Sequence, residues 1–354
     1  MKSNIIILLF LLSASSCIVD ENIKLDNNDY LPAELNDGWD ISTPEAEQAS
    51  TDAVHSLYKK FYSENDYVTA ISLLIAKNGK IIGEGYCRDK TDRDVYHQTQ
   101  SVTKSITSLV FGIACDKGYF PNLDTSIAIY FPNYIDATNP RKGITIKHLL
   151  TMKSGLDFEN SKDSEQLINY EENSVAFTLQ KDLLYTPGTI FKYHDGCPQL
   201  ISAMITKETG MSMAKFADTY LFEPLGITNY RWDNHKDGVT YGANNLWLTP
   251  RDMLKIGQLC TNYGTWDGKR IVSEDWITKS TQIYATPTLI GPYGYYWWIR
   301  PDNNAFTASG VGGQHIYIVP KQDLVLVFTA EPYASDLIST LQWDLESEII
   351  PLME

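Results

Sequence analysis

The chain has 354 residues, of which 43% are hydrophobic and 21% charged, a balance typical of globular rather than disordered proteins. This length suffices for one large domain or two modest ones with a substantial core. The formal net charge of −15 argues against a nucleic-acid partner, because binding to a phosphate backbone needs a basic face.

The first residues predict an export signal. Lys2 precedes the apolar run IIILLFLL, and the small residues SASS lead to Cys17. Eight apolar residues are too few to span a bilayer, which favours a signal peptide over residues 1–16 rather than an anchor helix. The context of Cys17 resembles a bacterial lipoprotein processing site. We therefore expect an exported lipoprotein, periplasmic or on the cell surface, with Cys17 as its lipidated membrane anchor. Ala14 stands where leucine is usual, so secretion without a lipid is the alternative.

An acidic segment follows this signal. Between Asp20 and Asp52, ten carboxylate residues are opposed by one cation, Lys24. A segment with so much charge has little apolar surface to bury. We therefore interpret residues 17–43, which begin with the lipidated Cys17, as a solvated tether.

The remaining cysteines and the histidines show no metal-binding pattern. Cys87, Cys115, Cys197 and Cys260 are widely spaced and form no CxxC pair, so we expect buried free thiols. The six histidines lack HExxH or similar ligand spacing. The sequence predicts no metal and no cofactor.

Strand signals lie at both ends of the chain and helix signals lie between them. We expect a helix over residues 44–62, then a hairpin over residues 70–86 with Asn78-Gly79 as its turn. Residues 101–118 form an apolar helix that begins near Ser101 and stops at Lys117-Gly118. The middle of the chain is helix and loop. Strands return in YGYYWWIRP, AFTASG, HIYIVP and LVLVFTA, and a closing helix is expected over residues 334–350.

This order predicts an α/β (α+β) domain over residues 44–354. Its antiparallel sheet, about residues 44–98 and 290–354, is assembled from both ends of the chain and flanked by helices. An inserted all-α lobe spans about residues 99–289. Ligand sites are often found between two such lobes.

Ser101 and Lys104 are candidates for catalysis. Residues three apart on a helix share a face, so Lys104 can reach the Ser101 hydroxyl. Serine needs a base to act as a nucleophile, and lysine serves as that base only when its charged form is disfavoured. At the start of a helix, the backbone N–H of Ser101 and the helix dipole would stabilise negative charge on a carbonyl oxygen under attack.

The spacing alone is weak support. About one SxxK is expected by chance in a chain of this length, and Ser56 to Lys59 is a second example, in a predicted helix. A serine that caps a helix, followed by a surface lysine, would look similar.

The surrounding motifs carry more weight. The stretches QSVTKSITSLVFGIACDKG, ITIKHLLTMKSGLDF, TPGTIFKYHDGCPQLISAMITKETG, LFEPLGI, LTPRDMLKIGQL, YGYYWWI and GVGGQHIYIVPKQDLVLVFTA occur in order over about residues 38–350. Together they resemble the serine β-lactamase-related hydrolases. This family includes class C β-lactamases, D-alanyl-D-alanine carboxypeptidases and other penicillin-binding proteins, and esterases and amidases of the 6-aminohexanoate-dimer hydrolase type. The match is closest to the last branch.

The resemblance implies a β-lactamase/transpeptidase-like fold and three active-site elements. In the first element, Ser101 is the acylated nucleophile and Lys104 its base or proton relay. In the second, Tyr193 of Tyr193-His194-Asp195 matches a tyrosine that exchanges protons; a core aromatic after a Pro-Gly turn is the alternative. In the third, Ala308-Ser309-Gly310 falls on a substrate-binding strand, and the backbone near Val311 would supply the second oxyanion donor with that of Ser101.

Two departures from the family pattern bear on the substrate. Asp195 replaces the usual asparagine, which exchanges an amide donor for an acceptor that could pair with Lys104. Ala308 removes the cation that meets a substrate carboxylate in lactamases and peptidases, although Ser309 or a distant arginine could take that part. Both changes favour neutral esters or amides.

The leading hypothesis is therefore a serine hydrolase that acts on a small-molecule or peptide-like ester or amide through an acyl-enzyme. A β-lactamase or D-alanyl-D-alanine carboxypeptidase acting on cell-wall-like substrates is one alternative. A non-catalytic binding module of the same fold is another, favoured by His194, Asp195 and Ala308. The aromatic run YGYYWWI either walls a substrate cleft or fills the core.

Overall fold

A central sheet is assembled from both ends of the chain. The computed structural model describes residues 29–63, 70–287 and 291–331. The strands are β1 (Asp40–Ile41), β2 (Ala70–Lys77), β3 (Lys80–Tyr86), β4 (His97–Gln98), β5 (Tyr230–Trp232), β6 (Leu246–Leu248), β7 (Thr265–Trp266), β8 (Lys269–Arg270), β9 (Trp298–Arg300), β10 (Ala305–Gly310), β11 (Gln314–Val319) and β12 (Leu324–Ala330). Seven of them form the central sheet in the order β1-β3-β2-β12-β11-β10-β9. Neighbours run antiparallel except the short pair β1 and β3, so the predicted sheet is confirmed.

Helices surround this sheet and form a lobe beside it. The α-helices are α1 (Thr51–Ser63), α2 (Val102–Asp116), α3 (Ile146–Leu150), α4 (Asn160–Asn169), α5 (Ser174–Leu179), α6 (Gly196–Thr209), α7 (Met213–Ala217), α8 (Pro250–Thr261) and α9 (Glu274–Ser280). Short turns of 3₁₀ or π helix are η2 (Lys90–Asp94), η3 (Ile127–Ile129), η4 (Pro140–Gly143), η5 (Asp218–Phe222), η6 (Glu223–Leu225), η7 (Pro301–Asn303) and η8 (Pro320–Gln322).

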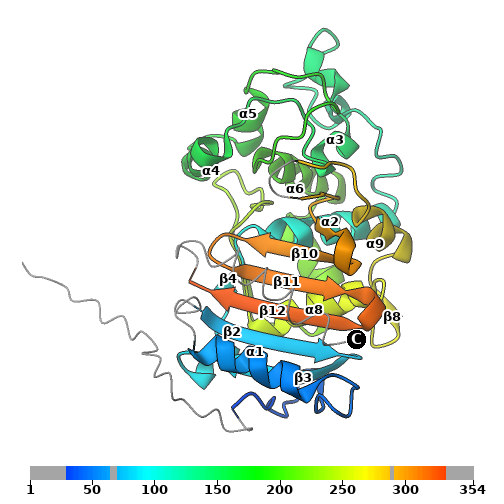
Figure 1. The fold of residues 1–354 in the computed structure, drawn as a ribbon. Coiled ribbons are helices and arrows are strands. Elements are labelled where there is room, and N and C mark those ends of the chain that lie inside the picture. The colour runs from blue at the N-terminus through cyan, green and yellow to red at the C-terminus, as the bar shows by residue number, and fades with distance from the viewer. Residues whose placement is uncertain (1–28, 64–69, 288–290, 332–354) are drawn as a thin grey trace, which may run out of the picture.

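The two faces of the sheet are covered by different helices. Along β12, Leu326 and Phe328 pack with α1, whereas Val325 and Val327 belong to the core that includes α2 and α8. Burial on both faces explains why the sequence of β12 is a continuous apolar run rather than an alternating one. Figure 1 shows α1 and α8 on opposite sides of the sheet.

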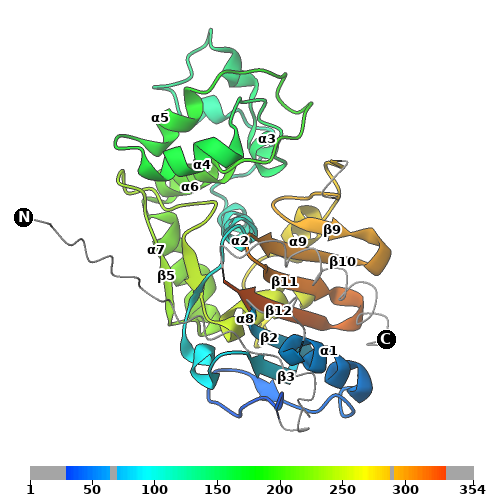
Figure 2. The ribbon, with the colours of Figure 1, turned by 60° about the vertical axis from the view of Figure 1, so that its left-hand side comes forward.

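Helix α8 packs against the sheet although it lies within the range that the sequence assigns to the helical lobe. A methyl group added at Gly257 would stand 2.3 Å from Val325 Cγ1 and 2.9 Å from Ile316 Cγ2, so only glycine allows this approach. Helices α3 to α6 make up the lobe itself. Central helix α2 lies between these helices and the sheet (Figure 2).

Two strand features depart from the sequence predictions. A small sheet of β4, β6 and β5 was not expected, because its strands are too short to show alternation. It fixes the chain just before α2, and the Thr99 N–H extends it by donating to Leu246 O at 2.9 Å. Within YGYYWWIRP only β9 is a strand, because Tyr296 adopts a left-handed φ of 65° that ends extended backbone.

The first helix begins later than predicted. The sequence predicts it over residues 44–62, but residues 44–48 form turns and α1 begins at Thr51. Gln48 adopts a φ of 60°, which interrupts any helix that starts at Pro44. Ser50 then caps α1, because its hydroxyl accepts the Ala53 N–H at 3.2 Å. The hairpin turn at Asn78-Gly79 and the bounds of α2 agree with the predictions.

The acidic segment is not solvated throughout, which corrects the prediction of a tether for its described part. Tyr30 and Trp39 are buried, and the Tyr30 ring stacks on Tyr58 with centroids 4.8 Å apart. These two aromatic residues provide apolar surface that the acidic composition conceals. From Asp29 onward the segment is therefore docked against the sheet domain.

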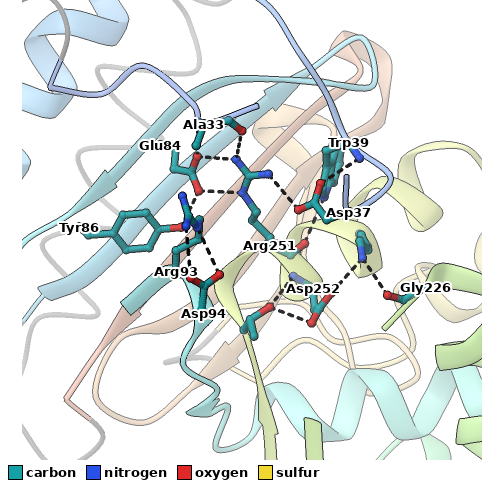
Figure 3. A network of polar contacts seen from close by, with 12 residues as sticks. Ala33, Asp37, Trp39, Glu84, Tyr86, Arg93, Asp94, Gly226, Arg251 and Asp252 are labelled. Atoms are coloured by element: carbon teal, nitrogen blue, oxygen red, sulfur yellow. Dashed lines mark hydrogen bonds and ion pairs between the residues drawn. The ribbon is translucent and has the colours of Figure 1, made fainter. Parts of the chain in front are cut away.

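A buried cation also holds this segment (Figure 3). Arg251 of α8 donates two hydrogen bonds to Glu84 of β3, at 2.8 and 2.6 Å, and pairs with Asp37 at 2.9 Å. It also donates to Ala33 O at 2.6 Å. Burial opposes the charge of Glu84, but the Arg251 guanidinium outweighs burial and lowers the pKa of this carboxyl.

The predicted signal peptide, Cys17 and the closing helix over residues 334–350 lie outside the described residues. Among the residues that the structure describes, no helix has the length and apolar character needed to cross a membrane.

The Arg251→Met variant should be strongly destabilised. It leaves the buried Glu84 and the partly buried Asp37 without their cation, which typically costs about 3–5 kcal/mol. Urea unfolding of the variant and the wild type measures this difference. Lys279→Met is the matched control, because it removes an exposed pair with Asp275 and should cost less than about 1 kcal/mol. A loss for Arg251→Met as small as that of the control would contradict this role.

Candidate active site

Ser101 occupies the N-cap position of α2, where the backbone has been forced into a tight turn. The preceding residue, Gln100, has a φ of 50°, a left-handed conformation that is uncommon for a residue with a side chain. The Ser101 side chain makes no capping hydrogen bond to the described helix. This excludes the alternative in which Ser101 serves only as a cap.

Lys104 lies one turn further along α2 and is buried. Its Nζ lies 2.9 Å from Ser101 Oγ, 2.8 Å from Asp195 Oδ1 and 3.2 Å from Ala243 O. Only 2% of the Lys104 side chain and 7% of the Asp195 side chain are exposed. The alternative of a surface lysine is therefore excluded as well.

The charge state of Lys104 differs from the predicted one. The sequence argument requires a lysine whose charged form is disfavoured. Burial does oppose its charge, but the Asp195 carboxylate and Tyr193 outweigh burial and raise the pKa of Lys104 above its usual value. The Asp195 carboxylate thus supplies a counter-charge that favours the ammonium form of Lys104.

Tyr193 completes the cluster from the loop before α6. Lys104 Nζ lies over its ring, 4.8 Å from the ring centre. The ring stacks on Trp298 of β9 at 5.7 Å, and Tyr293 meets it edge-on at 6.1 Å. Tyr193 is half-buried, so it is not the core aromatic of the alternative interpretation.

Asp195 is held through its backbone and through its carboxylate. Its backbone N–H donates to Asn160 Oδ1 at 2.9 Å, and Asn244 Nδ2 donates to its Oδ2 at 3.3 Å. Neighbouring His194 points elsewhere, since its Nε2 lies 3.0 Å from Ser154 Oγ. Burial lowers the pKa of His194 to about 3, so this imidazole is neutral at physiological pH.

Strand β10 brings the third predicted element against the start of α2. A Cβ added to Gly310 would stand 2.6 Å from Thr99 O and 3.1 Å from the Ser101 nitrogen. Glycine at this position therefore lets the strand approach the Ser101 amide closely. Val311, in the turn after the strand, is 58% exposed.

The side chains of β10 provide no positive charge. Ala308 is fully buried, and Ser309 Oγ lies 3.1 Å from Nδ1 of His315 on β11. Burial lowers the pKa of His315 to about 4, so it is neutral near physiological pH. The Ser309 hydroxyl is thus hydrogen-bonded to the neighbouring strand β11.

Other SxxK spacings in the chain show what a non-catalytic pair looks like. Ser56 and Lys59 are both exposed on α1. A third spacing, which the sequence reasoning did not weigh, joins Ser212 to Lys215. Ser212 caps α7, and the largely exposed Lys215 pairs with Asp218.

The aromatic run YGYYWWI mostly fills the core. Tyr293, Tyr295, Tyr296 and Trp297 are buried, whereas Trp298 is half-buried and contacts Tyr193. The core interpretation therefore holds for the first four aromatics and not for the last.

Among the residues that the structure describes, no cluster of three or more His, Cys, Asp and Glu side chains could hold a metal ion. The prediction of buried free thiols holds for Cys197 and Cys260, whereas Cys87 and Cys115 are only half-buried. The Cys87 thiol donates to Phe61 O at 3.6 Å.

Comparison with known proteins identifies the family. Residues 62–335 match the family model described as beta-lactamase. The chain belongs to the beta-lactamase family. The serine β-lactamase-related resemblance seen in the sequence is therefore confirmed, and so is the fold that it implies.

Individual proteins similar to this chain include a hydrolase and several solved structures of the same fold. A 6-aminohexanoate-dimer hydrolase of Paenarthrobacter ureafaciens is 21% identical over 326 residues, which cover 84% of this chain and 82% of that protein. A family VIII carboxylesterase shares the fold with a TM-score of 0.64 and 17% identity, over 85% of this chain and 97% of the other. A penicillin-binding protein homologue from Caulobacter crescentus has a TM-score of 0.66 at 16% identity, over 86% and 95% of the two chains.

Sequence reasoning missed several residues of this beta-lactamase-family site. Asn244 and Asn160 position Asp195, and Trp298 stacks on Tyr193. Asn244 precedes Asn245, whose φ is 57°, but a two-asparagine loop is too common to mark a site. In the sequence, Trp298 could be suspected of lining the site only because it belongs to the aromatic run YGYYWWI.

The Gly310→Ala variant tests the close approach of β10 to Ser101. Its methyl group would meet the Thr99 carbonyl and crowd the Ser101 amide, so the strand must shift outward. We expect the rate of Ser101 labelling by a fluorophosphonate to fall at least tenfold while the protein stays folded. Gly143→Ala is the control, because its nearest atom would be 3.8 Å away, and it should keep the wild-type rate. Equal rates for the two variants would show that the approach does not matter.

Proposed function

We propose that this protein is a serine hydrolase that cleaves ester or amide bonds through an acyl-enzyme on Ser101. The observation that carries the proposal is the cluster at the start of α2. Lys104 Nζ lies 2.9 Å from Ser101 Oγ and 4.8 Å from the centre of the Tyr193 ring, so a lysine and a tyrosine both lie beside the predicted nucleophile. Membership in a hydrolase family supports it.

In the proposed acylation step, Ser101 Oγ bonds to the substrate carbonyl carbon and its proton passes to the Lys104–Tyr193 pair. The backbone N–H groups of Ser101 and Val311 would stabilise the oxyanion. The intermediate then collapses, and the leaving alcohol or amine takes up the proton. In deacylation, water attacks the acyl carbon, the pair accepts a proton from that water, and Ser101 recovers its hydroxyl.

The preferred substrate is a neutral or weakly charged acyl group. The family's substrate-facing cation is absent at Ala308, and the nearby His315 is neutral. Exposed Val311 and half-buried Trp298 would offer apolar contact instead. The names of the 6-aminohexanoate-dimer hydrolase and the carboxylesterase support cleavage of an amide or an ester bond.

A D-alanyl-D-alanine carboxypeptidase or β-lactamase activity on cell-wall-like substrates is the second candidate, favoured by the penicillin-binding protein homologue. Comparing turnover of p-nitrophenyl esters, short linear amides, nitrocefin and D-Ala-D-Ala peptides separates the two. Faster turnover of nitrocefin or the peptides would favour the second candidate.

We further propose that the hydrolase is exported and held at a membrane by a lipid on Cys17, in the periplasm or at the cell surface. The apolar run before Cys17 and the small residues SASS support this placement.

Replacement of Ser101 and Tyr193 tests the hydrolase directly. Intact-protein mass spectrometry should show one fluorophosphonate adduct on the wild type and none on Ser101→Ala. Tyr193→Phe should lower kcat/KM for a p-nitrophenyl ester by about 10²–10⁴-fold, because a positioned acid–base group contributes about that much.

Two variants serve as controls for these losses. Ser56→Ala removes the exposed serine of another SxxK spacing, and Tyr185→Phe removes an exposed hydroxyl; both should behave as the wild type does. A wild type that neither labels nor hydrolyses any substrate of the panel would instead indicate a non-catalytic binding module.

A further inference from the structure

Two residues beside the candidate active site adopt left-handed backbone conformations although neither is glycine. Gln100, directly before Ser101, has a φ of 50°, and Asn245, in the loop before β6, has a φ of 57°. Such a conformation persists only where the surrounding structure enforces it. Asparagine visits it more readily than most residues, but glutamine is not among the residues that do so. The contacts that hold these two turns therefore bear on the position of Ser101.

A single side chain binds both turns. Gln98 of β4 donates from its Nε2 to Asn245 Oδ1 at 3.1 Å. Its Oε1 accepts a hydrogen bond from Gln100 Nε2 at 3.0 Å. All three side chains are half-buried. The two ends of one planar amide thus bind two different turns.

The backbone pairing between β4 and β6 ends just before the first turn. The Thr99 N–H still donates to Leu246 O, but at Gln100 the chain leaves the small sheet to enter α2. From within that helix, Thr103 Oγ1 donates to the Gln100 carbonyl at 2.7 Å. Across to the loop before β6, the turn is connected through the side chain of Gln98.

The loop before β6 also contacts two other members of the site. Ala243 O accepts a hydrogen bond from Lys104 Nζ at 3.2 Å, and Asn244 Nδ2 donates to Asp195 Oδ2 at 3.3 Å. The second left-handed turn follows these two residues directly. Gln98 thus connects the turn before the predicted nucleophile to the loop that contacts the lysine and the carboxylate.

We propose that Gln98 is a positioning residue, whose amide fixes Ser101 in the site by joining the left-handed turns at Gln100 and Asn245. This inference rests on the proposed hydrolase function, in which Ser101 is the nucleophile. It assigns Gln98 no contact with the substrate. Displacing a reacting group by about 1 Å can lower a rate by about 10²-fold, so the loss of two hydrogen bonds has a measurable effect here.

Two replacements of Gln98 test this role. Gln98→Met has nearly the length of glutamine but breaks both bonds, because it offers no N–H donor and no oxygen. Gln98→Glu keeps both, because one carboxylate oxygen accepts from Gln100 and the other accepts from Asn245 Nδ2 once that amide turns over. Fluorophosphonate labelling of Ser101 should be at least about tenfold slower in Gln98→Met and within about threefold of the wild type in Gln98→Glu.

A charge reversal tests the contact between Gln98 and Asn245 by itself. Asn245→Asp keeps an acceptor for Gln98 Nε2, so it should also label within about threefold of the wild type. Combined with Gln98→Glu, it places two carboxylates side by side, and neither can donate a hydrogen bond. The double variant should label at least about tenfold more slowly than either single variant, a loss that independent sites would not show.

Steady-state kinetics distinguish positioning from a loss of stability. With a p-nitrophenyl ester, Gln98→Met should lower kcat about as much as the labelling rate and change KM by less than about twofold. Asn229→Leu is the matched control. Asn229 precedes β5, at the other edge of the same small sheet, and donates its side-chain amide to Asp94 O at 2.9 Å. Its replacement should leave kcat and the labelling rate unchanged.

The outcomes separate this inference from the function on which it rests. A wild type that never labels overturns the hydrolase and the inference together. A wild type that labels overturns the inference alone if Gln98→Met labels at the same rate or if Gln98→Glu is as slow as Gln98→Met. If Gln98→Met does not fold, Gln100→Met decides, because it loses one of the two bonds and leaves the small sheet intact. It should label at least about threefold more slowly than the wild type, and an unchanged rate would contradict the proposal.

Discussion

A buried ammonium group can exist in this protein only where the fold supplies acceptors for it, and the site is organised around that requirement. Lys104 lies on a helix with almost every residue buried, so water cannot solvate its charge. Its acceptors come from separate parts of the chain: Ser101 from its own helix, Asp195 from the start of α6 and Ala243 from the loop before β6. The start of α6 and the loop before β6 must both lie against α2 before the charge is compensated.

A similar solution occurs at a distance from the site. Arg251 is another buried cation, and its carboxylates come from β3 and from the acidic N-terminal segment. Arginine suits that position because its planar group makes two parallel bonds to Glu84 and remains charged at any accessible pH. Lysine suits the first position because its compact group can contact a hydroxyl, a backbone carbonyl and a carboxylate at once. Arg251 holds the N-terminal segment against the sheet, and Lys104 contacts the predicted nucleophile.

Elements with strong local signals could be predicted from the sequence. The Asn78-Gly79 hairpin, helix α2 and strands β10 to β12 have turn residues or apolar periodicity that fix their type. The start of α1 was placed too early, because the backbone at Gln48 depends on tertiary contacts. Strands β4, β5 and β6 are two or three residues long, and no periodicity can be read over such a length.

Within the site, proximity could be predicted but charge could not. Spacing and motif order predict that Ser101, Lys104 and Tyr193 lie close together. The replacement of the family's asparagine by Asp195 suggests an ion pair with Lys104. The balance between burial and that ion pair depends on a distance of 2.8 Å and on exposure, and neither is encoded locally. Likewise, the docking of residues 29–43 depends on Tyr30 and Trp39 finding apolar partners, which their acidic context conceals.

A crystal structure of the protein after reaction with a fluorophosphonate would test the central claim most directly, because it shows which atom was attacked and where the oxyanion lies. We expect phosphorus bonded to Ser101 Oγ, its free oxygen between the amides of Ser101 and Val311, and Lys104 still paired with Asp195. Phosphorus on another residue, or a phosphoryl oxygen turned away from both amides, would contradict the account.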